Sequence, residues 1–199
     1  MAAYVDSGEA ILETLFNPPM AFAVTMPGWF GTHFERMKAY NQFATLGVVV
    51  GTEATARVKR FSLVRDLIGP IKYKMSDTDL DKLKRGMILA ARVFFEAGAE
   101  SVYPASFVDV EIKRDNEIER LINEHIQKPD DLILNSSHPQ GGNAMSDDKK
   151  IGVVDSEFKV HGYDNLFVCD ASVFPTTIRI NPQFTIMAMA DYFSHLGAL

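Results

Sequence analysis

Three stretches in the second half of this 199-residue chain combine residue types that can do chemistry. Residues 136–143, Ser-Ser-His-Pro-Gln-Gly-Gly-Asn, place His138 in a loop that a proline and two glycines constrain. Residues 165–175 contain an acidic residue next to a small one, and residues 181–186, Asn-Pro-Gln-Phe-Thr-Ile, lead into an apolar segment. An imidazole exchanges a proton near neutral pH, so His138 is a candidate catalytic base, with a structural role as the alternative.

The segment that begins at Asn181 predicts a helix with a positively polarised start. Asparagine is a preferred N-cap, and Pro182 suits the first helical position, where its missing N–H costs no hydrogen bond. The amides of Gln183 and Phe184 would then point outward from the positive end of the helix. Such a start favours a full or partial negative charge. A simple N-cap role explains Asn181 equally well.

The spacing of other reactive residues disfavours other kinds of site. The remaining histidines form no zinc-binding pattern such as His-Glu-x-x-His and are predicted to be structural: His33, His125, His161 and His195. Cys169 is the sole cysteine, which excludes a multi-cysteine metal site, so we expect no metal. A serine hydrolase built on Ser137 or Ser172 is a weak third hypothesis, because no Gly-x-Ser-x-Gly elbow is present.

The composition is that of an ordinary soluble globular protein. Hydrophobic residues make up 47% of the chain, charged residues 23%, and the formal net charge is −6. Because no basic stripe is available to neutralise phosphates, we expect no nucleic-acid partner. The longest apolar runs, such as residues 46–50, are too short for a membrane span, and no stretch resembles a signal peptide. The cellular location stays open, since Met1 need not be the natural start.

The first part of the chain is predicted to form strands and a short helix. Residues 10–14 predict a strand, and two prolines at positions 18 and 19 are expected to exclude further helix or ladder. Residues 32–42 predict a short helix. Residues 43–50 and 55–60 predict a hairpin around a glycine-containing connection, and residues 71–75 predict a third strand.

Two longer helices are predicted next. Ser76 and Asp79 form a start similar to a capping box, and Gly98 supplies the stop. Between them, apolar residues recur at helical spacing: Leu80, Leu83, Met87, Ala90 and Phe94. A second helix over residues 116–126 is predicted to bury Ile118, Leu121 and Ile122.

The last part of the chain changes character. Residues 135–145 form a polar, glycine-rich loop, residues 158–160 and 166–169 predict two strands, and a final helix runs from 181 to about 195. The whole pattern predicts an α+β fold. Its parts are an antiparallel-sheet domain with flanking helices and a C-terminal strand–loop–helix unit.

Taken together and in this order, the three stretches resemble the C-terminal signature of the glucose–methanol–choline (GMC) oxidoreductases, which are flavin-dependent alcohol oxidoreductases. The cholesterol-oxidase-like branch is the most similar, since it pairs a His-Pro-x-Gly-Gly loop with an Asn-Pro helix start. The resemblance is strong over about residues 135–193. Three ordered motifs at matching separations are far more specific than any one of them.

The resemblance assigns roles to individual residues. His138 matches the family's histidine beside the flavin, which meets the substrate hydroxyl as a base or an orienting partner. Asn181 matches the second active-site residue. Asp170 and Ala171 match the acidic–small pair whose backbone approaches FAD. The family's helix start, which faces the flavin C2 carbonyl, is matched by four consecutive residues: Asn181, Pro182, Gln183 and Phe184.

Glu13 is a weaker match, to a glutamate that approaches the substrate in cholesterol oxidases. An apolar pocket would make it a better base, and a half-exposed strand carboxylate is the alternative.

By the same resemblance, residues 1–134 form the substrate-binding domain, and residues 135–199 return to complete the FAD-binding domain. The apolar region around Trp29 favours a hydrophobic alcohol, such as a sterol or a long-chain alcohol.

Two features depart from the family pattern. Arg179 stands near a position where relatives often carry glycine. In addition, none of the thirteen glycines belongs to a Gly-x-Gly-x-x-Gly fingerprint, which holds the FAD pyrophosphate. We therefore expect the C-terminal portion of an FAD-dependent oxidoreductase that acts on the CH–OH group of an alcohol, with the N-terminal FAD-binding segment supplied in cis or in trans. The alternative is a non-catalytic truncated remnant, or a module that binds an apolar ligand.

Overall fold

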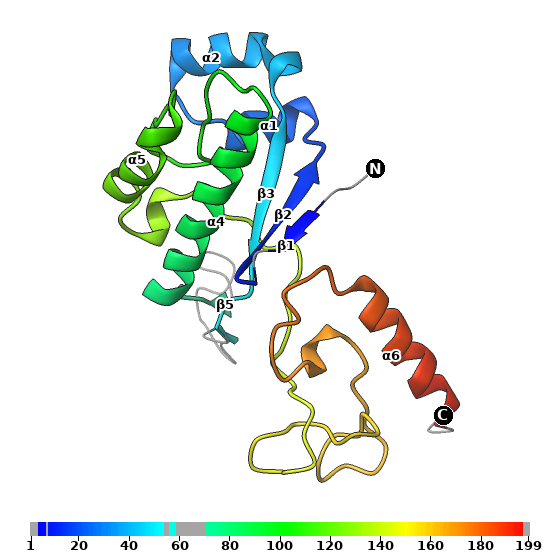
Figure 1. The fold of residues 1–199 in the computed structure, drawn as a ribbon. Coiled ribbons are helices and arrows are strands. Elements are labelled where there is room, and N and C mark those ends of the chain that lie inside the picture. The colour runs from blue at the N-terminus through cyan, green and yellow to red at the C-terminus, as the bar shows by residue number, and fades with distance from the viewer. Residues whose placement is uncertain (1–3, 7, 54–55, 59–70, 197–199) are drawn as a thin grey trace. The chain divides into compact units, whose positions relative to one another are not determined.

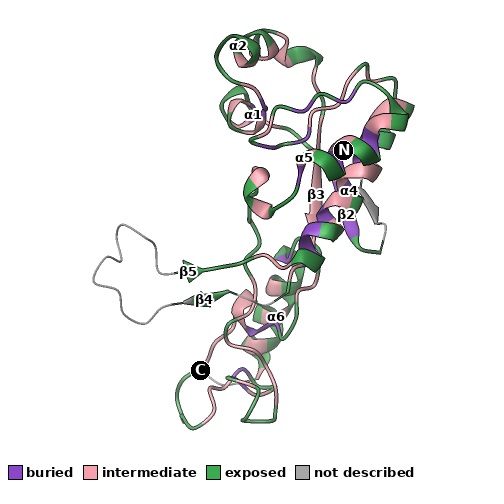
Figure 2. Cartoon of the chain, turned by 90° about the vertical axis from the view of Figure 1, so that its left-hand side faces the viewer, coloured by how far each residue is buried: buried purple, intermediate pink, exposed green. Residues whose placement is uncertain are grey.

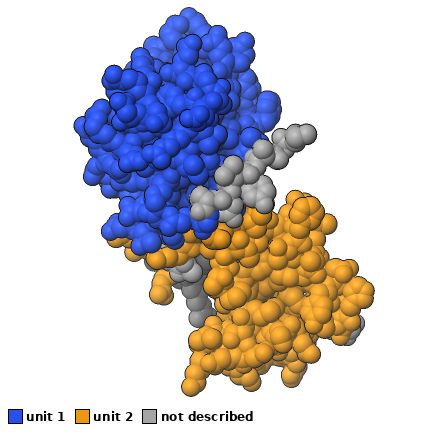
Figure 3. Space-filling view, in the orientation of Figure 1, with its two compact units in different colours: residues 1–50, 76–135 blue, residues 51–75, 136–199 orange. Residues whose placement is uncertain are grey.

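A computed structural model of the protein describes residues 4–6, 8–53, 56–58 and 71–196. The backbone contacts divide the chain into two compact units, which Figure 3 draws in different colours. Unit 1 comprises residues 1–50 and 76–135, and unit 2 comprises residues 51–75 and 136–199. The division of function between residues 1–134 and 135–199 stays a prediction.

Unit 1 is built on a three-stranded antiparallel sheet with the order β1–β2–β3 (Figure 1). Its strands are β1 (Tyr4–Asp6), β2 (Ala10–Leu15) and β3 (Thr45–Val50). Along β2 the Cα partners run from Ala10 opposite Val50 to Leu15 opposite Thr45. The strand predicted over residues 10–14 is therefore confirmed, and it occupies the middle of the sheet.

Two short helices, α1 (Pro19–Thr25) and α2 (Phe30–Lys38), lie between β2 and β3 in the chain. The prediction that the two prolines exclude a helix was wrong, because Pro19 takes the first helical position, where a proline loses no hydrogen bond. The helix predicted over residues 32–42 is confirmed with an earlier start, and it is followed by a 3-10 turn at Tyr40–Gln42.

The helix α4 (Asp77–Glu96) packs against β2 and β3. Its predicted start is confirmed, since Ser76 Oγ accepts a hydrogen bond of 3.2 Å from the amide of Asp79. Gly98 follows the end of the helix with a φ of 89°, a conformation that glycine adopts without strain. Figure 2 shows buried and exposed positions interleaved along α4, as expected of a helix that turns one side to a sheet.

Gly86 allows α4 to approach the sheet closely. A Cβ atom at this position would lie 2.5 Å from Val48 Cγ1 and 2.9 Å from Ala10 Cβ, which are distances that real Cβ contacts do not show. We expect Gly86→Ala to lower the free energy of unfolding by about 1–3 kcal/mol, because the added methyl forces the helix and sheet apart.

Gly31→Ala is the matched control for this substitution. No described atom lies within 4 Å of the position that a Cβ on Gly31 would take, and alanine favours the helical backbone of α2. Urea unfolding followed by circular dichroism compares the two variants. Equal losses of unfolding free energy in the two variants would contradict the close approach of α4 to the sheet.

The helix α5 (Ile118–His125) also packs against α4. Ile118 and Ile122 are buried as predicted, whereas Leu121 is half-buried. Short 3-10 turns stand before and after it, at Asp115–Glu117 and Pro129–Asp131. Helix α4 thus flanks the antiparallel sheet of unit 1 and α5 packs against α4, and the predicted α+β class is confirmed.

The predicted hairpin between residues 43–50 and 55–60 was wrong. Strand β3 pairs with β2, whereas β4 (Arg57–Val58) pairs antiparallel with β5 (Ile71–Lys72), which confirms a strand in the region 71–75. The stretch 55–60 contains one large apolar residue among polar ones, so β3 gains more by lying beside the apolar β2. Residues 54–55 and 59–70 lie outside the described residues.

Unit 2 is mostly loop, closed by the helix α6 (Gln183–His195), which confirms the predicted final helix. The two predicted strands at 158–160 and 166–169 do not form a regular ladder and are joined by one isolated antiparallel bridge, between Lys159 and Phe167. The carboxylate of Asp155 accepts hydrogen bonds from the amides of Glu157 and Lys159, and it bends this stretch away from a regular strand.

A small apolar core holds unit 2 together. Its buried members are Val154, Phe158, Val173 and Phe174. Partly buried side chains of α6, including Ile186, Met189 and Phe193, pack against them. Because residues 171–174 supply half of the buried members, the core also fixes the loop that precedes α6.

Candidate active site

The loop that carries His138 is held in place by its second half. The amides of Gly141, Asn143 and Met145 donate hydrogen bonds of 3.0, 2.9 and 2.8 Å to the carbonyls of three successive residues, Ala171, Ser172 and Val173. The loop needs glycine where it turns, since Gly141 and Gly142 have φ angles of 79° and 116°. His138 itself is exposed at the start of this anchored loop.

Asp170 and Ala171 form the other side of this contact. The carboxylate of Asp170 accepts a hydrogen bond of 2.7 Å from the amide of Ser172 and so caps the 3-10 turn Ala171–Val173. Asn143 Nδ2 lies 2.8 Å from the hydroxyl oxygen of Ser172 and donates to it. That hydroxyl is therefore paired with an amide, which cannot act as the base that a serine nucleophile needs.

A side chain joins the His138 loop to the segment before Asn181. Gln140 Oε1 accepts a hydrogen bond of 3.1 Å from the amide of Ile178. The next residue, Arg179, has a φ of 57°, and its amide donates to the hydroxyl of Thr177. A positive φ is a conformation that glycine adopts freely, so the arginine at this position carries backbone strain that glycine would avoid.

Gly51, which belongs to unit 2, is buried beneath this segment. A Cβ atom on Gly51 would lie 2.5 Å from Arg179 Cγ and 2.9 Å from Thr177 Cγ2. The aliphatic stem of Arg179 therefore lies over a residue that has no side chain. This packing accommodates the stem of a long side chain at position 179.

The start of α6 differs by one residue from the prediction. The first helical hydrogen bond runs from the amide of Ile186 to the carbonyl of Pro182, 2.9 Å, so Pro182 and not Asn181 is the N-cap residue. Pro182 has helical dihedral angles (φ −82°, ψ 0°), since its ring fixes φ near the helical value. Within the described part of the chain, no side chain caps α6, and Asn181 is exposed just ahead of it.

The head of α6 presents amides and an apolar side chain together. The amides of Gln183, Phe184 and Thr185 precede the first helical hydrogen bond, so they stand at the positive end of the helix. The Phe184 side chain is 83% exposed, and Met187 and Tyr192 are also exposed farther along. Over residues 183–195 no side chain is fully buried, so this apolar helix leaves much of its surface uncovered.

Glu13 belongs to unit 1, whereas the residues just described belong to unit 2. It is half-buried in β2, with its Cα opposite Tyr4 of β1 and Gly47 of β3. Because Ala10 faces Gly86 of α4 and side chains alternate along a strand, Glu13 points to the sheet face opposite α4. Its assignment as a base stays a prediction.

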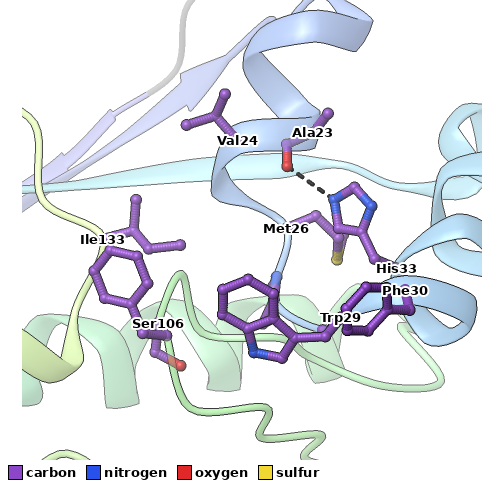
Figure 4. Close-up of a pocket in the computed structure, with 11 residues that line it drawn as sticks. Ala23, Val24, Met26, Trp29, Phe30, His33, Ser106 and Ile133 are labelled. Atoms are coloured by element: carbon purple, nitrogen blue, oxygen red, sulfur yellow. Dashed lines mark hydrogen bonds between the residues drawn. The ribbon is translucent and has the colours of Figure 1, made fainter.

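Unit 1 also contains a hollow of about 360 Å³, which is called the α1–α2 hollow below (Figure 4). Residues 23–33 form one side of it, and the other side comes from Ser106, Phe107 and Ile133. The sequence pointed to Trp29 but not to these three residues. They lie far from it in the chain, and no local pattern marks them.

A second hollow, of about 340 Å³, lies in unit 2 beside its core. Its lining is almost wholly apolar and includes Phe158, Phe174, Ile178, Met189 and Tyr192. Three α6 residues on one side of the helix, at positions 185, 189 and 192, contribute to it. Among the residues that the structure describes, no three histidine, cysteine or acidic side chains lie together as metal ligands would.

The arrangement of loop, capped turn and helix head is accompanied by a match to a known family. Residues 65–190 match the family described as GMC oxidoreductase. The chain belongs to this family. The resemblance to this family is confirmed, and the matched range contains residues 136–143, 165–175 and 181–186.

Similar proteins include GMC oxidoreductases of plants and bacteria. A long-chain-alcohol oxidase of Arabidopsis thaliana, FAO3, is 28% identical over 91% of this chain. An uncharacterized GMC-type oxidoreductase of Mycobacterium tuberculosis is 25% identical over 93% of the chain. A dehydrogenase of Strobilurus tenacellus, str4, is 41% identical over 28% of the chain, which is 9% of its own length.

The chain spans only part of these relatives. It covers 25% of the Arabidopsis oxidase and 28% of the mycobacterial protein. GMC oxidoreductases generally bind FAD, and the FAD-binding N-terminal part of the family is absent from this chain. Within the described residues, no helix combines the length and the apolar character that a membrane crossing requires.

Proposed function

We propose that this chain forms the substrate-facing part of an FAD-dependent oxidoreductase that acts on the CH–OH group of an alcohol. One observation carries the proposal: residues 140–145 are hydrogen-bonded to residues 171–178, so the His138 loop and the segment leading to Asn181 belong to one packed unit. A proton acceptor and the head of a helix can then serve one site. The membership in the GMC family supports the same reading.

The residues of this chain fit one part of FAD. Free amides at the head of α6 suit a carbonyl or an anion, and the exposed Phe184 suits the edge of an aromatic ring. Asn181 through Phe184, with the backbone of Asp170 and Ala171, would hold this part of the cofactor. The pyrophosphate fingerprint does not occur in the sequence, so tight binding requires an N-terminal FAD-binding segment, in cis or in trans.

Each polar residue has a proposed task toward the alcohol. His138 accepts the hydroxyl proton, which raises the electron density on the oxygen and makes hydride loss from carbon easier. The side-chain amide of Asn181 hydrogen-bonds the same oxygen and fixes its position. Glu13 is the alternative base. When bound, FAD supplies the acceptor for the hydride.

The proposed substrate is an apolar alcohol, such as a long-chain alcohol or a sterol. The similarity to the Arabidopsis long-chain-alcohol oxidase supports such a substrate, and the similarity to the Strobilurus dehydrogenase supports an oxidation reaction. The exposed Trp29 and Phe30 side chains of unit 1 also suit an apolar molecule. The likeness to the cholesterol-oxidase-like branch belongs to this proposal and stays a prediction.

Reconstitution tests the proposal. The 199-residue chain is purified with excess FAD, alone and together with an FAD-binding segment that carries the glycine fingerprint. We expect little bound flavin alone, and bound flavin with alcohol-dependent reduction of a redox dye in the combined sample. The same flavin content without any alcohol-dependent reduction would favour the alternative, a non-catalytic module that binds an apolar ligand.

A further inference from the structure

The α1–α2 hollow has an uncharged and mostly apolar lining. Among its described lining residues none is charged, and polar side-chain groups come only from Trp29, His33 and Ser106. The Nε2–H of His33 donates to the carbonyl of Ala23 at 2.9 Å, as Figure 4 shows, and the hydroxyl of Ser106 donates to the carbonyl of Val108. A polar ligand would lose hydrogen bonds to water here that the lining does not fully replace, whereas a hydrocarbon has no such hydrogen bonds to lose.

The volume of the hollow suits a small hydrocarbon ligand. At about 360 Å³ it is roughly twice the size of a cavity of about 150 Å³ that binds benzene in another protein. It also lies at the lower end of the range of about 300–1,000 Å³ that is typical of small-molecule sites. A single alkyl chain therefore fits, and a bulky multi-ring ligand would be left partly outside.

The wall of the hollow is held rigid from behind. Arg36, whose side chain is 11% exposed, donates from Nη1 to the carbonyl of Pro27 and to Asp109 Oδ1, both at 2.6 Å. Its guanidinium lies 4.3 Å from the centre of the Tyr103 ring. Gly28 fits over this arginine with a φ of 109°, and a Cβ atom there would lie 2.8 Å from Nη1. The hollow is thus preformed, which lowers the entropic cost of binding.

The rim of the hollow is aromatic and open to water. Trp29 is 66% exposed, Phe30 is 94% exposed, and Phe107 is more than half exposed. Phe30 also has a φ of 47°, an uncommon conformation for a residue of this size. These side chains would lose contact with water when an apolar ligand enters, so the hydrophobic effect favours binding at the rim as well.

We propose that the α1–α2 hollow binds the hydrocarbon chain of an uncharged, single-chain amphiphile such as a long-chain alcohol. The hydroxyl end stays at the aromatic rim, where it keeps its contact with water, because Trp29, Phe30 and Phe107 are all exposed there. Identifying this ligand with the substrate rests on the proposed function, but binding itself does not. A concave, preformed hollow favours one chain over a flat bilayer surface or a second copy of the protein.

The sole tryptophan of the chain reports on this site directly. The 199-residue chain, without flavin, is titrated with 1-decanol while the emission of Trp29 is recorded. We expect a saturable blue shift, because the ligand displaces water from the indole, and no shift with 1-butanol at the same concentration. A linear, unsaturated change with both alcohols would overturn the proposal.

Two variants and a control locate the binding. Ala23→Leu fills the hollow while keeping the backbone carbonyl that pairs with His33, and Val24→Asn places an amide in an exposed part of the lining. Both are expected to weaken 1-decanol binding by about tenfold or more. Ala97→Leu, at the exposed end of α4, adds the same atoms outside the hollow and should bind as the parent does. Equal binding by all four proteins would overturn the proposal.

A different occupant of the α1–α2 hollow would give a different result in these experiments. A shift with neutral phosphatidylcholine vesicles but none with 1-decanol would assign the rim to a membrane. A dimer in sedimentation that persists in 1-decanol and blocks the shift would assign it to a second copy. If 1-decanol binds but the reconstituted protein oxidises no alcohol, the proposed function fails and the hollow stands. If the reconstituted protein oxidises an alcohol but 1-decanol does not shift the Trp29 emission of the 199-residue chain, the proposed function stands and the proposed binding in the α1–α2 hollow is overturned.

Discussion

Replacing His138 with alanine in the FAD-loaded protein is expected to lower kcat for a long-chain alcohol by about a hundred- to ten-thousandfold, the usual contribution of a general base. The loop should keep its place, since backbone hydrogen bonds from residues 141, 143 and 145 hold it against residues 171–173. Because the base acts in the transition state, kcat should fall more than KM changes. Steady-state dye reduction over a range of alcohol concentrations measures both quantities.

The controls separate a base from an orienting partner. His138→Gln retains hydrogen bonding but cannot accept the proton, so it should be nearly as slow as the alanine variant if His138 is the base. His125→Ala, in α5 of unit 1, removes an imidazole outside the proposed site and should leave the activity unchanged. Full activity of the alanine variant at His138 would transfer the role of base to Glu13 or to no residue of this chain.

Phe158→Ala is expected to lower the stability of unit 2 by about 3–5 kcal/mol, the usual cost of removing a buried phenylalanine side chain. Phe158 is 2% exposed, and its ring centre lies 5.5 Å from that of Phe193 in α6. Its loss leaves a cavity beneath α6 and the loop 171–174. Trp29 lies in unit 1, so hydrogen exchange of amides in residues 136–196 is the appropriate measurement.

Phe184→Ala provides the matched control in the same unit. Its side chain is 83% exposed, so in the isolated chain the substitution should change stability by no more than about 0.5 kcal/mol. In the reconstituted protein the same change should weaken flavin retention, because Phe184 belongs to the proposed cofactor contact. Equal destabilisation by the two alanine variants would mean that the core of unit 2 is not centred on Phe158.

The elements with strong local signals were predicted correctly. The start of α4 was visible because Ser76 and Asp79 form a local hydrogen bond that the spacing alone indicates. The final helix and the strand at residues 10–14 were visible for similar reasons. The pairing of β3 could not be predicted from a local pattern. It depends on whether β3 pairs with β2, some 30 residues earlier, or with the nearby polar stretch at residues 55–60.

The candidate site shows the same limit. The motifs indicated His138, Asp170 and Asn181, which lie within the range of the family match, and their roles stay predictions. The sequence could not indicate that Gln140 would connect the His138 loop to Ile178, since this hydrogen bond joins residues 38 positions apart. Nor could it show that Pro182 and not Asn181 is the N-cap of α6, because the sequence pattern does not fix a helix boundary to the residue.

The most direct test of the central claim is an experimental structure of the FAD-loaded protein with an unreactive alcohol analogue. We expect the imidazole of His138 and the side-chain amide of Asn181 both to lie within hydrogen-bonding distance of the alcohol oxygen, with the head of α6 against the flavin. An alcohol oxygen that contacts neither residue, or a flavin remote from α6, would contradict this claim.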